Sequence, residues 1–196
     1  MFYSEVLKNV PSNWSPMTTD DRYMKKPLMP YTEEFAKVIE LLCKRQYYGR
    51  QFGIFRIQNP LLWSKFLLRK SEYDQRGPVE IKTLYHDTSI ANAESIIEFN
   101  FDWRMGQRTK YGQGVYFSVE ASAAFRHSTK DGSRLRAMFV VDVLVQNVQE
   151  GQPNMCLPAI GFDTILANNN NTYVKFFDSE YYPKYFMVYE PNPFFF

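Results

Sequence analysis

The stretch Leu84-Tyr-His-Asp-Thr-Ser89 decides how the fold is interpreted, because it marks the passage from a strand to a helix. A short strand is expected at residues 82–85, and a helix is expected from Ser89 to Phe99. A loop with two glycines follows, in the stretch Tyr111-Gly-Gln-Gly-Val-Tyr-Phe117, and it leads into a strand at residues 114–117. The inward positions of the helix are Ile90, Ala93, Ile96 and Ile97.

Helix signals dominate the first half of the chain, and strand signals dominate the second. Thr32 and Asn59 are N-cap residues for two helices, and Pro60 fits the first turn of the second helix because its missing N–H costs nothing there. Alternating valines predict a long strand at residues 136–148. Helices early and strands late predict an α+β fold with a mainly antiparallel sheet. The other expected elements are strands at residues 52–57, 172–177 and 185–189 and a helix at residues 120–127.

The composition predicts one domain with a proper core. The chain has 196 residues, of which 45% are hydrophobic and 22% charged. We expect an irregular lead-in at residues 1–30, pinned by Phe2, Tyr3 and Trp14, and a catalytic domain at residues 31–196. The net charge of +2 argues against broad capture of nucleic acid. Cys43 and Cys156 lack the spacing of a metal or disulfide site, so we expect no metal and a reducing, intracellular compartment, the nucleus or the cytoplasm. No run approaches 18 apolar residues, so we expect no membrane span. We also expect a monomer.

Several motifs in a fixed order resemble the catalytic domain of poly(ADP-ribose) polymerases. Two of them are the stretches at residues 84–89 and 111–117 quoted above. The others are Arg56-Ile-Gln-Asn-Pro-Leu-Leu-Trp63, the run from Asn100 to Arg104, and Tyr182-Pro-Lys-Tyr185. The closest resemblance is to the small branch that transfers single ADP-ribose units. It implies an ADP-ribosyltransferase fold, in which helices flank a split, mainly antiparallel sheet. It also implies that NAD is the substrate and that the acceptor is a protein or, as the less favoured alternative, a nucleic-acid end.

The same resemblance implies roles for residues of the two central motifs. His86 would bind the hydroxyls of the adenosine-side ribose, and Tyr116 would stack on the nicotinamide ring. The backbone of Asp87 would meet the nicotinamide carboxamide, where fixed donors suit a rigidly held leaving group. Three further residues complete the expected NAD cleft: Thr88 at a ribose, Arg104 at the diphosphate and Tyr111 at the rim.

The sequence also departs from the family pattern. Thr172 stands where polymer-forming relatives have a glutamate, and a threonine cannot hold a negative charge, so single transfer is expected rather than chain growth. Asp87 replaces a glycine, and Ala124 falls where a serine usually bonds the carboxamide. The second stacking aromatic falls on His127 or on Phe125, depending on the alignment.

Other interpretations stand beside the enzyme. The departures favour a transferase-like module that has lost catalysis and serves as a scaffold or binding surface. Position alone also permits His86 to be a satisfied core histidine and Tyr116 to be ordinary strand packing. A hydrolase is disfavoured, because the chain has two histidines and no Gly-x-Ser-x-Gly motif.

Overall fold

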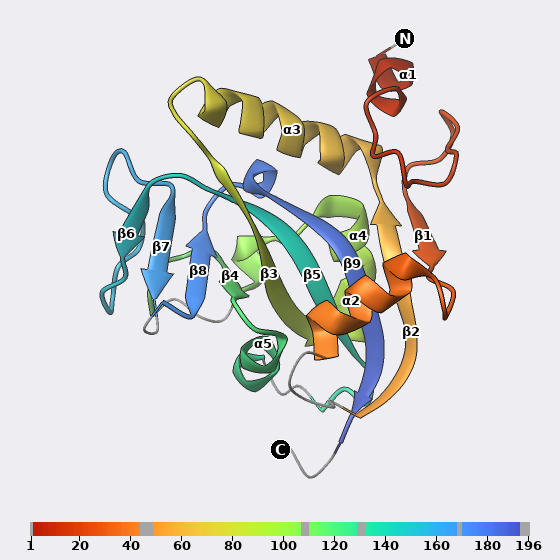
Figure 1. Cartoon of the computed structure of the whole chain (residues 1–196). Helices are drawn as coiled ribbons and strands as arrows, with labels where there is room; N and C mark the ends of the chain where they lie inside the picture. The colour runs from red at the N-terminus through yellow and green to blue at the C-terminus, as the bar shows by residue number, and fades with distance from the viewer. Residues whose placement is uncertain (1, 44–48, 107–109, 129–131, 168–169, 193–196) are drawn as a thin grey trace.

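The structure is a computed structural model that describes residues 2–43, 49–106, 110–128, 132–167 and 170–192. Within these residues one nine-stranded sheet carries helices on both faces (Figure 1). The helices are α1 (Phe2–Leu7), α2 (Glu33–Cys43), α3 (Pro60–Asp74), α4 (Ile90–Phe99) and α5 (Ala121–His127), with short 3-10 turns η1 (Trp103–Met105) and η2 (Asp178–Glu180). The strands are β1 (Met24–Pro27), β2 (Gly49–Gln58), β3 (Glu80–Ser89), β4 (Val115–Ser118), β5 (Arg136–Val145), β6 (Val148–Glu150), β7 (Thr164–Ala167), β8 (Thr172–Lys175) and β9 (Tyr181–Pro191).

The sheet is mainly antiparallel, which confirms the expected α+β class. Its strand order is β1-β2-β9-β5-β3-β4-β8-β7-β6, and only β6 and β7 run parallel. β3 pairs with β5 from Glu80 to Ser89, whereas it pairs with β4 through Tyr85 and Ser118. This single junction joins two halves of the sheet, and it is the split that the fold class implies.

β5 is the centre of the core, and every one of its residues is buried. Successive side chains of a strand point to opposite faces. Phe139 therefore packs in one cluster with Ile97 of α4, and Val140 packs in another with Phe125 of α5. Figure 1 shows α2 and α4 on opposite faces of the sheet, so both faces are covered.

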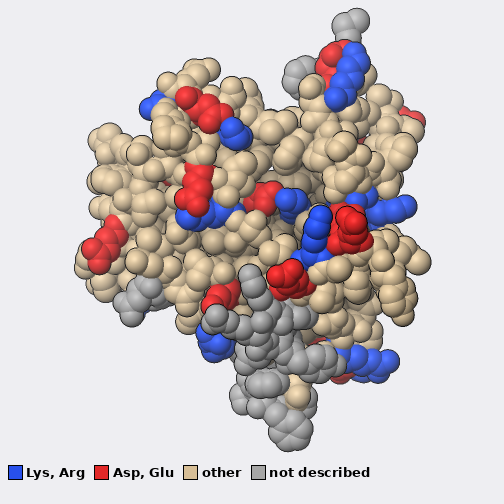
Figure 2. Space-filling model, viewed as in Figure 1, with Lys and Arg blue, Asp and Glu red and all other residues tan. Residues whose placement is uncertain are grey.

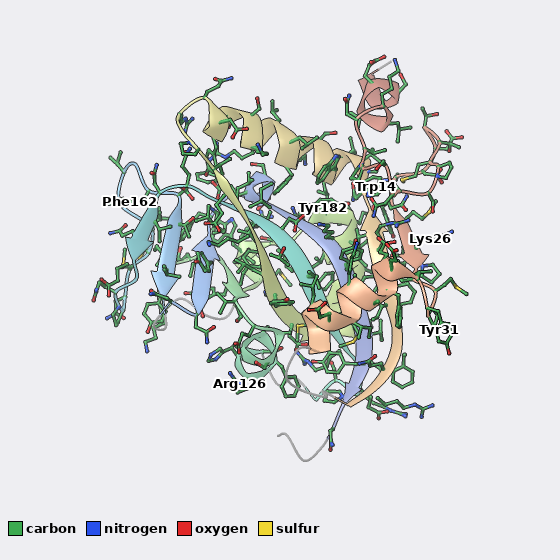
Figure 3. All side chains as sticks on the ribbon, in the orientation of Figure 1. Trp14, Lys26, Tyr31, Arg126, Phe162 and Tyr182 are labelled. Carbon is green, nitrogen blue, oxygen red and sulfur yellow. The ribbon has the colours of Figure 1, made fainter. Side chains whose placement is uncertain are left out.

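The lead-in is less irregular than the sequence predicts. It contains α1 and the edge strand β1, which pairs with β2 through Met24 and Gln58 at one end. β1 has one half-buried and three exposed residues, so no alternating pattern reveals it. Trp14 stacks on Tyr182 with ring centroids 6.3 Å apart, and Figure 3 shows the two side chains where the lead-in meets the sheet. The side chains of Phe2 and Tyr3 lie outside the described residues, and the division at residue 30 stays a prediction.

Other differences concern short strands and strand ends. The predicted strand at residues 136–148 ends at Val145, and β6 and β7 have no counterpart in the prediction. The last predicted strand extends on both sides to become β9. In the described part of the chain, no helix has both the length and the apolar character to cross a membrane.

Candidate active site

A cavity of about 790 Å³ opens where β3 and β4 separate beyond Tyr85 and Ser118. Its walls come from β3, the start of α4, the loop before β4, the C-terminal end of α5 and the first residue of β8. Six residues singled out in the sequence lie on this wall together with Asp87 and Ala124. They are His86, Thr88, Tyr111, Tyr116, His127 and Thr172.

The His86 side chain ties the two strands together just beyond their backbone junction. Its Nδ1 lies 2.9 Å from the backbone oxygen of Tyr116. A carbonyl oxygen only accepts, so Nδ1 is the donor, and in the neutral ring Nε2 is an acceptor. Phe101 and Phe117 meet the imidazole edge to face at centroid distances of 4.9 and 6.0 Å. The ring is therefore held in one orientation on the cavity wall.

Tyr116 is fixed by its own loop. Its hydroxyl accepts a hydrogen bond from the backbone N–H of Tyr111 at 3.0 Å and donates to the carbonyl of Gly112 at 2.9 Å. Gly112 has a φ of 122°, a conformation that side-chain-bearing residues rarely adopt. The half-buried phenol ring thus presents a fixed flat surface to the cavity.

Gly114 lets this loop lie close to β8, and a methyl group there is expected to destabilise the domain. A Cβ at Gly114 would lie 2.4 Å from the backbone oxygen of Lys175 and 2.8 Å from Cγ1 of Val174. Gly114→Ala should lower the free energy of unfolding in urea by about 1–3 kcal/mol, the usual cost of overpacking. Wild-type stability of Gly114→Ala would contradict the close packing of β4 on β8.

The end of α5 decides which aromatic side chain faces the cavity. Ala124, His127 and Ser128 line it. Phe125 does not line the cavity, and its ring lies 6.3 Å from that of Tyr189 in the core. Of the two alignments left open by the sequence, the structure brings His127 to the cavity.

Thr172 opens β8 and lies opposite Ser118 of β4 in the sheet. It is 4% exposed and shares the cavity with His86 and Tyr116. The two glutamates nearest the C-terminus lie elsewhere. Glu180 is buried against Arg69 and Lys175, and Glu190 pairs with Arg134. Of these three residues, only Thr172 lines the cavity.

Asp87 takes part in a buried network that the sequence did not reveal. Arg136 donates from Nε to Oδ1 of Asp87 at 2.7 Å, and the Tyr189 hydroxyl donates to Oδ2. Arg136 also donates to Oγ of Ser128, which in turn donates to the backbone oxygen of Asp87 at 2.9 Å. Burial raises the pKa of the Asp87 carboxyl, and the charge of Arg136 and the hydrogen bond from Tyr189 oppose that rise.

Two residues of the quoted motifs do not line this cavity. Arg104 is not on the cavity wall, because its Nε donates to Asp102 at 2.7 Å and its side chain is 72% exposed. Trp63 packs against Tyr182 with ring centroids 5.2 Å apart, on the wall of a separate cavity of about 410 Å³ near the lead-in. Thr88 does line the main cavity, and its hydroxyl accepts from Asn92 at 3.0 Å.

On the face that Figure 2 shows, basic and acidic residues are interspersed.

Comparisons with known proteins show the family of the chain. The family model described as the poly(ADP-ribose) polymerase catalytic domain matches residues 32–157. The mouse protein mono-ADP-ribosyltransferase PARP12 is 29% identical over 94% of this chain, which covers 28% of that protein. Human PARP12 is 27% identical over 93% of the chain, again covering 28% of the relative, and human protein mono-ADP-ribosyltransferase PARP14 is 25% identical over 92%, covering 11%. The chain thus spans between about a tenth and somewhat over a quarter of these relatives' lengths. Because the family model covers more than half of the residues, this chain belongs to the poly(ADP-ribose) polymerase catalytic domain family.

Proposed function

We propose that this domain transfers single ADP-ribose units from NAD to a protein side chain and releases nicotinamide. The observation that carries the proposal is the bond between His86 and Tyr116 across the split in the sheet, inside a cavity of about 790 Å³. The cavity falls within the range of about 300–1,000 Å³ typical of small-molecule sites. Relatives that bear the name mono-ADP-ribosyltransferase support the same reaction.

The fixed rings suit the two parts of NAD. Nε2 of His86 accepts a hydrogen bond from a ribose hydroxyl, and the face of Tyr116 stacks on the nicotinamide ring. The bond between nicotinamide nitrogen and the anomeric carbon of its ribose breaks, and its electron pair leaves with neutral nicotinamide. The acceptor atom bonds to the same carbon and loses its proton to solvent. Rigid rings favour this reaction because the leaving group stays in place while the ribose moves.

NAD binding distinguishes this proposal from the alternative of an inactive scaffold. Ala124 favours the scaffold, because an alanine brings no hydroxyl to the cavity. A ligand that binds only the folded domain stabilises it by RT ln(1 + [L]/Kd), about 2.7 kcal/mol at a hundredfold excess over Kd. An uncleavable NAD analogue should therefore raise the melting temperature of the wild-type domain. No shift at saturating concentration would favour the scaffold.

Thr172 leads to a prediction about product length. Elongation needs a group that activates a hydroxyl of an ADP-ribose already attached, and such assistance contributes about 10²–10⁴-fold. A threonine hydroxyl forms hydrogen bonds but holds no charge, so labelled NAD should yield one ADP-ribose per acceptor site, seen as a single mass increment. Long ladders from the wild-type domain would contradict the placement of Thr172 at this position.

Variants at residue 172 distinguish a ribose contact from strand packing. Thr172→Val keeps the branched shape and removes the hydroxyl, so it should lower the transfer rate about 2- to 10-fold if the hydroxyl meets the ribose. Thr172→Glu should increase NAD hydrolysis or transfer in the same case. A Val variant with wild-type transfer and a Glu variant that is only less stable would assign Thr172 to packing.

The setting of the reaction follows from the same proposal. We place the domain inside the cell, in the nucleus or cytoplasm, because two cysteines without paired spacing fit a reducing compartment. We also propose that residues 31–196 form the catalytic unit and that the domain acts as a monomer without a metal. The lead-in contributes the edge strand β1 and the Trp14 contact to that unit.

A further inference from the structure

The separate cavity near the lead-in has a wall of aromatic rings. The rings of Trp14, Trp63, Tyr182 and Tyr185 line it. Trp14 stacks on Tyr182, and the indole of Trp63 meets Tyr182 edge to face. Both tyrosines are buried, whereas the two indoles are half-buried, so part of each indole is open to a ligand. Such rings favour a flat, apolar partner.

Three neighbouring strands supply the charged residues of this cavity. They are Arg56 of β2, Lys184 of β9 and Asp142 of β5. On the other side the lead-in is held on α3, because the indole N–H of Trp63 donates to the backbone oxygen of Asn9 at 3.0 Å. Figure 1 shows the lead-in beside α3 and β2. The cavity therefore lies at a junction of the lead-in, α3 and the sheet.

Arg56 has one guanidinium nitrogen left for a ligand. Its side chain is 7% exposed, and its Nη1 donates to Glu34 at 2.6 Å. Its Nε donates to Gln58 at 3.2 Å, and none of the described residues accepts a hydrogen bond from Nη2. A buried donor without an acceptor costs free energy, so an acceptor on a ligand is favoured at this position.

Lys184 and Asp142 set the charge that a ligand meets. Nζ of Lys184 lies 3.0 Å from Oδ2 of Asp142, which occupies one of the three donors of the ammonium group. Arg56 and Lys184 bring two positive charges to the cavity wall and Asp142 brings one negative charge, so one positive charge remains. Glu34 pairs with Arg56 but does not line the cavity. A carboxylate matches this charge better than a phosphate ester, which carries about 1.5 to 2 negative charges at neutral pH.

We infer that this cavity binds a small aromatic carboxylate. The ring of the ligand packs against the indoles of Trp14 and Trp63, and its carboxylate accepts hydrogen bonds from Nη2 of Arg56 and Nζ of Lys184. The volume of about 410 Å³ lies within the range of about 300–1,000 Å³ typical of small-molecule sites. None of the described residues lines both this cavity and the main one, so the inference does not rest on the proposed function.

The three tryptophans of the chain report which cavity a ligand enters. Trp14 and Trp63 line the cavity near the lead-in, and Trp103 lines the main one. Indoleacetate is the probe, because it joins a flat ring to one carboxylate. Heteronuclear NMR should show that it shifts the indole N–H signals of Trp14 and Trp63 and leaves that of Trp103 in place. A shift confined to Trp103, or no shift at all, would overturn the inference.

The carboxylate contact is tested with a neutral relative of the probe and two lysine variants. Indoleacetamide has the same ring without the charge, so the wild-type domain should bind it at least about 5-fold more weakly than indoleacetate. The Lys184 side chain is 44% exposed, so Lys184→Gln should fold normally. This variant should bind indoleacetate about 5- to 10-fold more weakly than the wild type and indoleacetamide equally well. The control is Lys70→Gln, since Lys70 pairs with Asp74, is 34% exposed and does not line the cavity. It should bind both compounds as the wild type does.

Each other outcome has a definite meaning. Equal affinities of the wild type for the acid and the amide, or equal losses in Lys184→Gln and Lys70→Gln, would overturn the inference. Phenyl phosphate distinguishes the two anion classes: tighter binding of it than of indoleacetate, with the same Trp14 and Trp63 shifts, would assign the cavity to phosphate esters and overturn the carboxylate. Lys184→Gln should bind an uncleavable NAD analogue as the wild type does. If the wild-type domain bound indoleacetate but not the NAD analogue, the proposed function would fail and this inference would stand.

Discussion

Replacing Arg136 with methionine is expected to lower the free energy of unfolding by about 3–5 kcal/mol, the usual cost of removing one partner from a buried ion pair. The side chains of Arg136 and Asp87 are 2% and 0% exposed, so the variant leaves a carboxylate without its charge partner inside the protein. The Tyr189 hydroxyl still donates to Asp87, but it carries no compensating charge. Urea unfolding followed by circular dichroism measures the loss.

A surface ion pair on the neighbouring turn provides the control. Arg134 pairs with Glu190, but its side chain is 78% exposed, so Arg134→Met should change stability by no more than about 1 kcal/mol. In the double variant Asp87→Asn/Arg136→Met, the buried charge is removed together with its partner. The double variant should therefore be more stable than the sum of the single changes predicts, by about 1–3 kcal/mol. Equal effects of Arg134→Met and Arg136→Met would contradict the importance of the buried pair.

The sequence predicts the elements whose own pattern reveals them. The alternating valines of β5 lie on one face, and the other face of the strand is also buried, so its apolar character is strong along its whole length. The capping residue Asn59 forms the expected bond, since its side chain accepts from the N–H of Leu62. β1 and β7 have four residues each, and β1 is largely exposed at the sheet edge. Their strand conformation comes from pairing with a neighbour, which no local pattern records.

In the candidate site, too, the sequence predicts residues that stand in motifs and misses those that only the fold brings together. His86 and Tyr116 stand in motifs, so the sequence names them before the structure brings them together. Arg136 and Tyr189 lie 49 and 102 residues from Asp87, and neither belongs to a motif. Only the order β9-β5-β3 in the sheet makes them neighbours.

A local interaction explains why Arg104 does not line the cavity. Asp102 accepts hydrogen bonds from both the backbone N–H and Nε of Arg104, at 2.9 and 2.7 Å. Short-range bonds of this kind compete with any longer-range partner. A motif match identifies the residue type, but it does not say which of two available partners the side chain takes.

His86→Ala is expected to weaken NAD binding roughly 100-fold, which corresponds to about 2.7 kcal/mol. Two effects add in this variant. The acceptor Nε2 for the ribose hydroxyl is lost, and so is the donor Nδ1 that ties β3 to the Tyr116 carbonyl. The imidazole also leaves a gap between Phe101 and Phe117, so the wall that carries the stacking ring loses its support.

His86→Asn separates the two effects. An asparagine amide nitrogen is placed much as Nδ1 of a histidine is, so it can still donate to the Tyr116 carbonyl, but it offers nothing at the position of Nε2. We therefore expect the free energy of unfolding of the ligand-free His86→Asn domain to lie within about 1 kcal/mol of the wild-type value. The NAD analogue should still bind this variant at least 10-fold more weakly than it binds the wild type. Thermal unfolding and titration calorimetry on the same samples measure both quantities. If His86→Asn bound the NAD analogue as tightly as the wild type, His86 would be a strand tie and not a ligand contact, and the core-histidine interpretation of this residue would be correct.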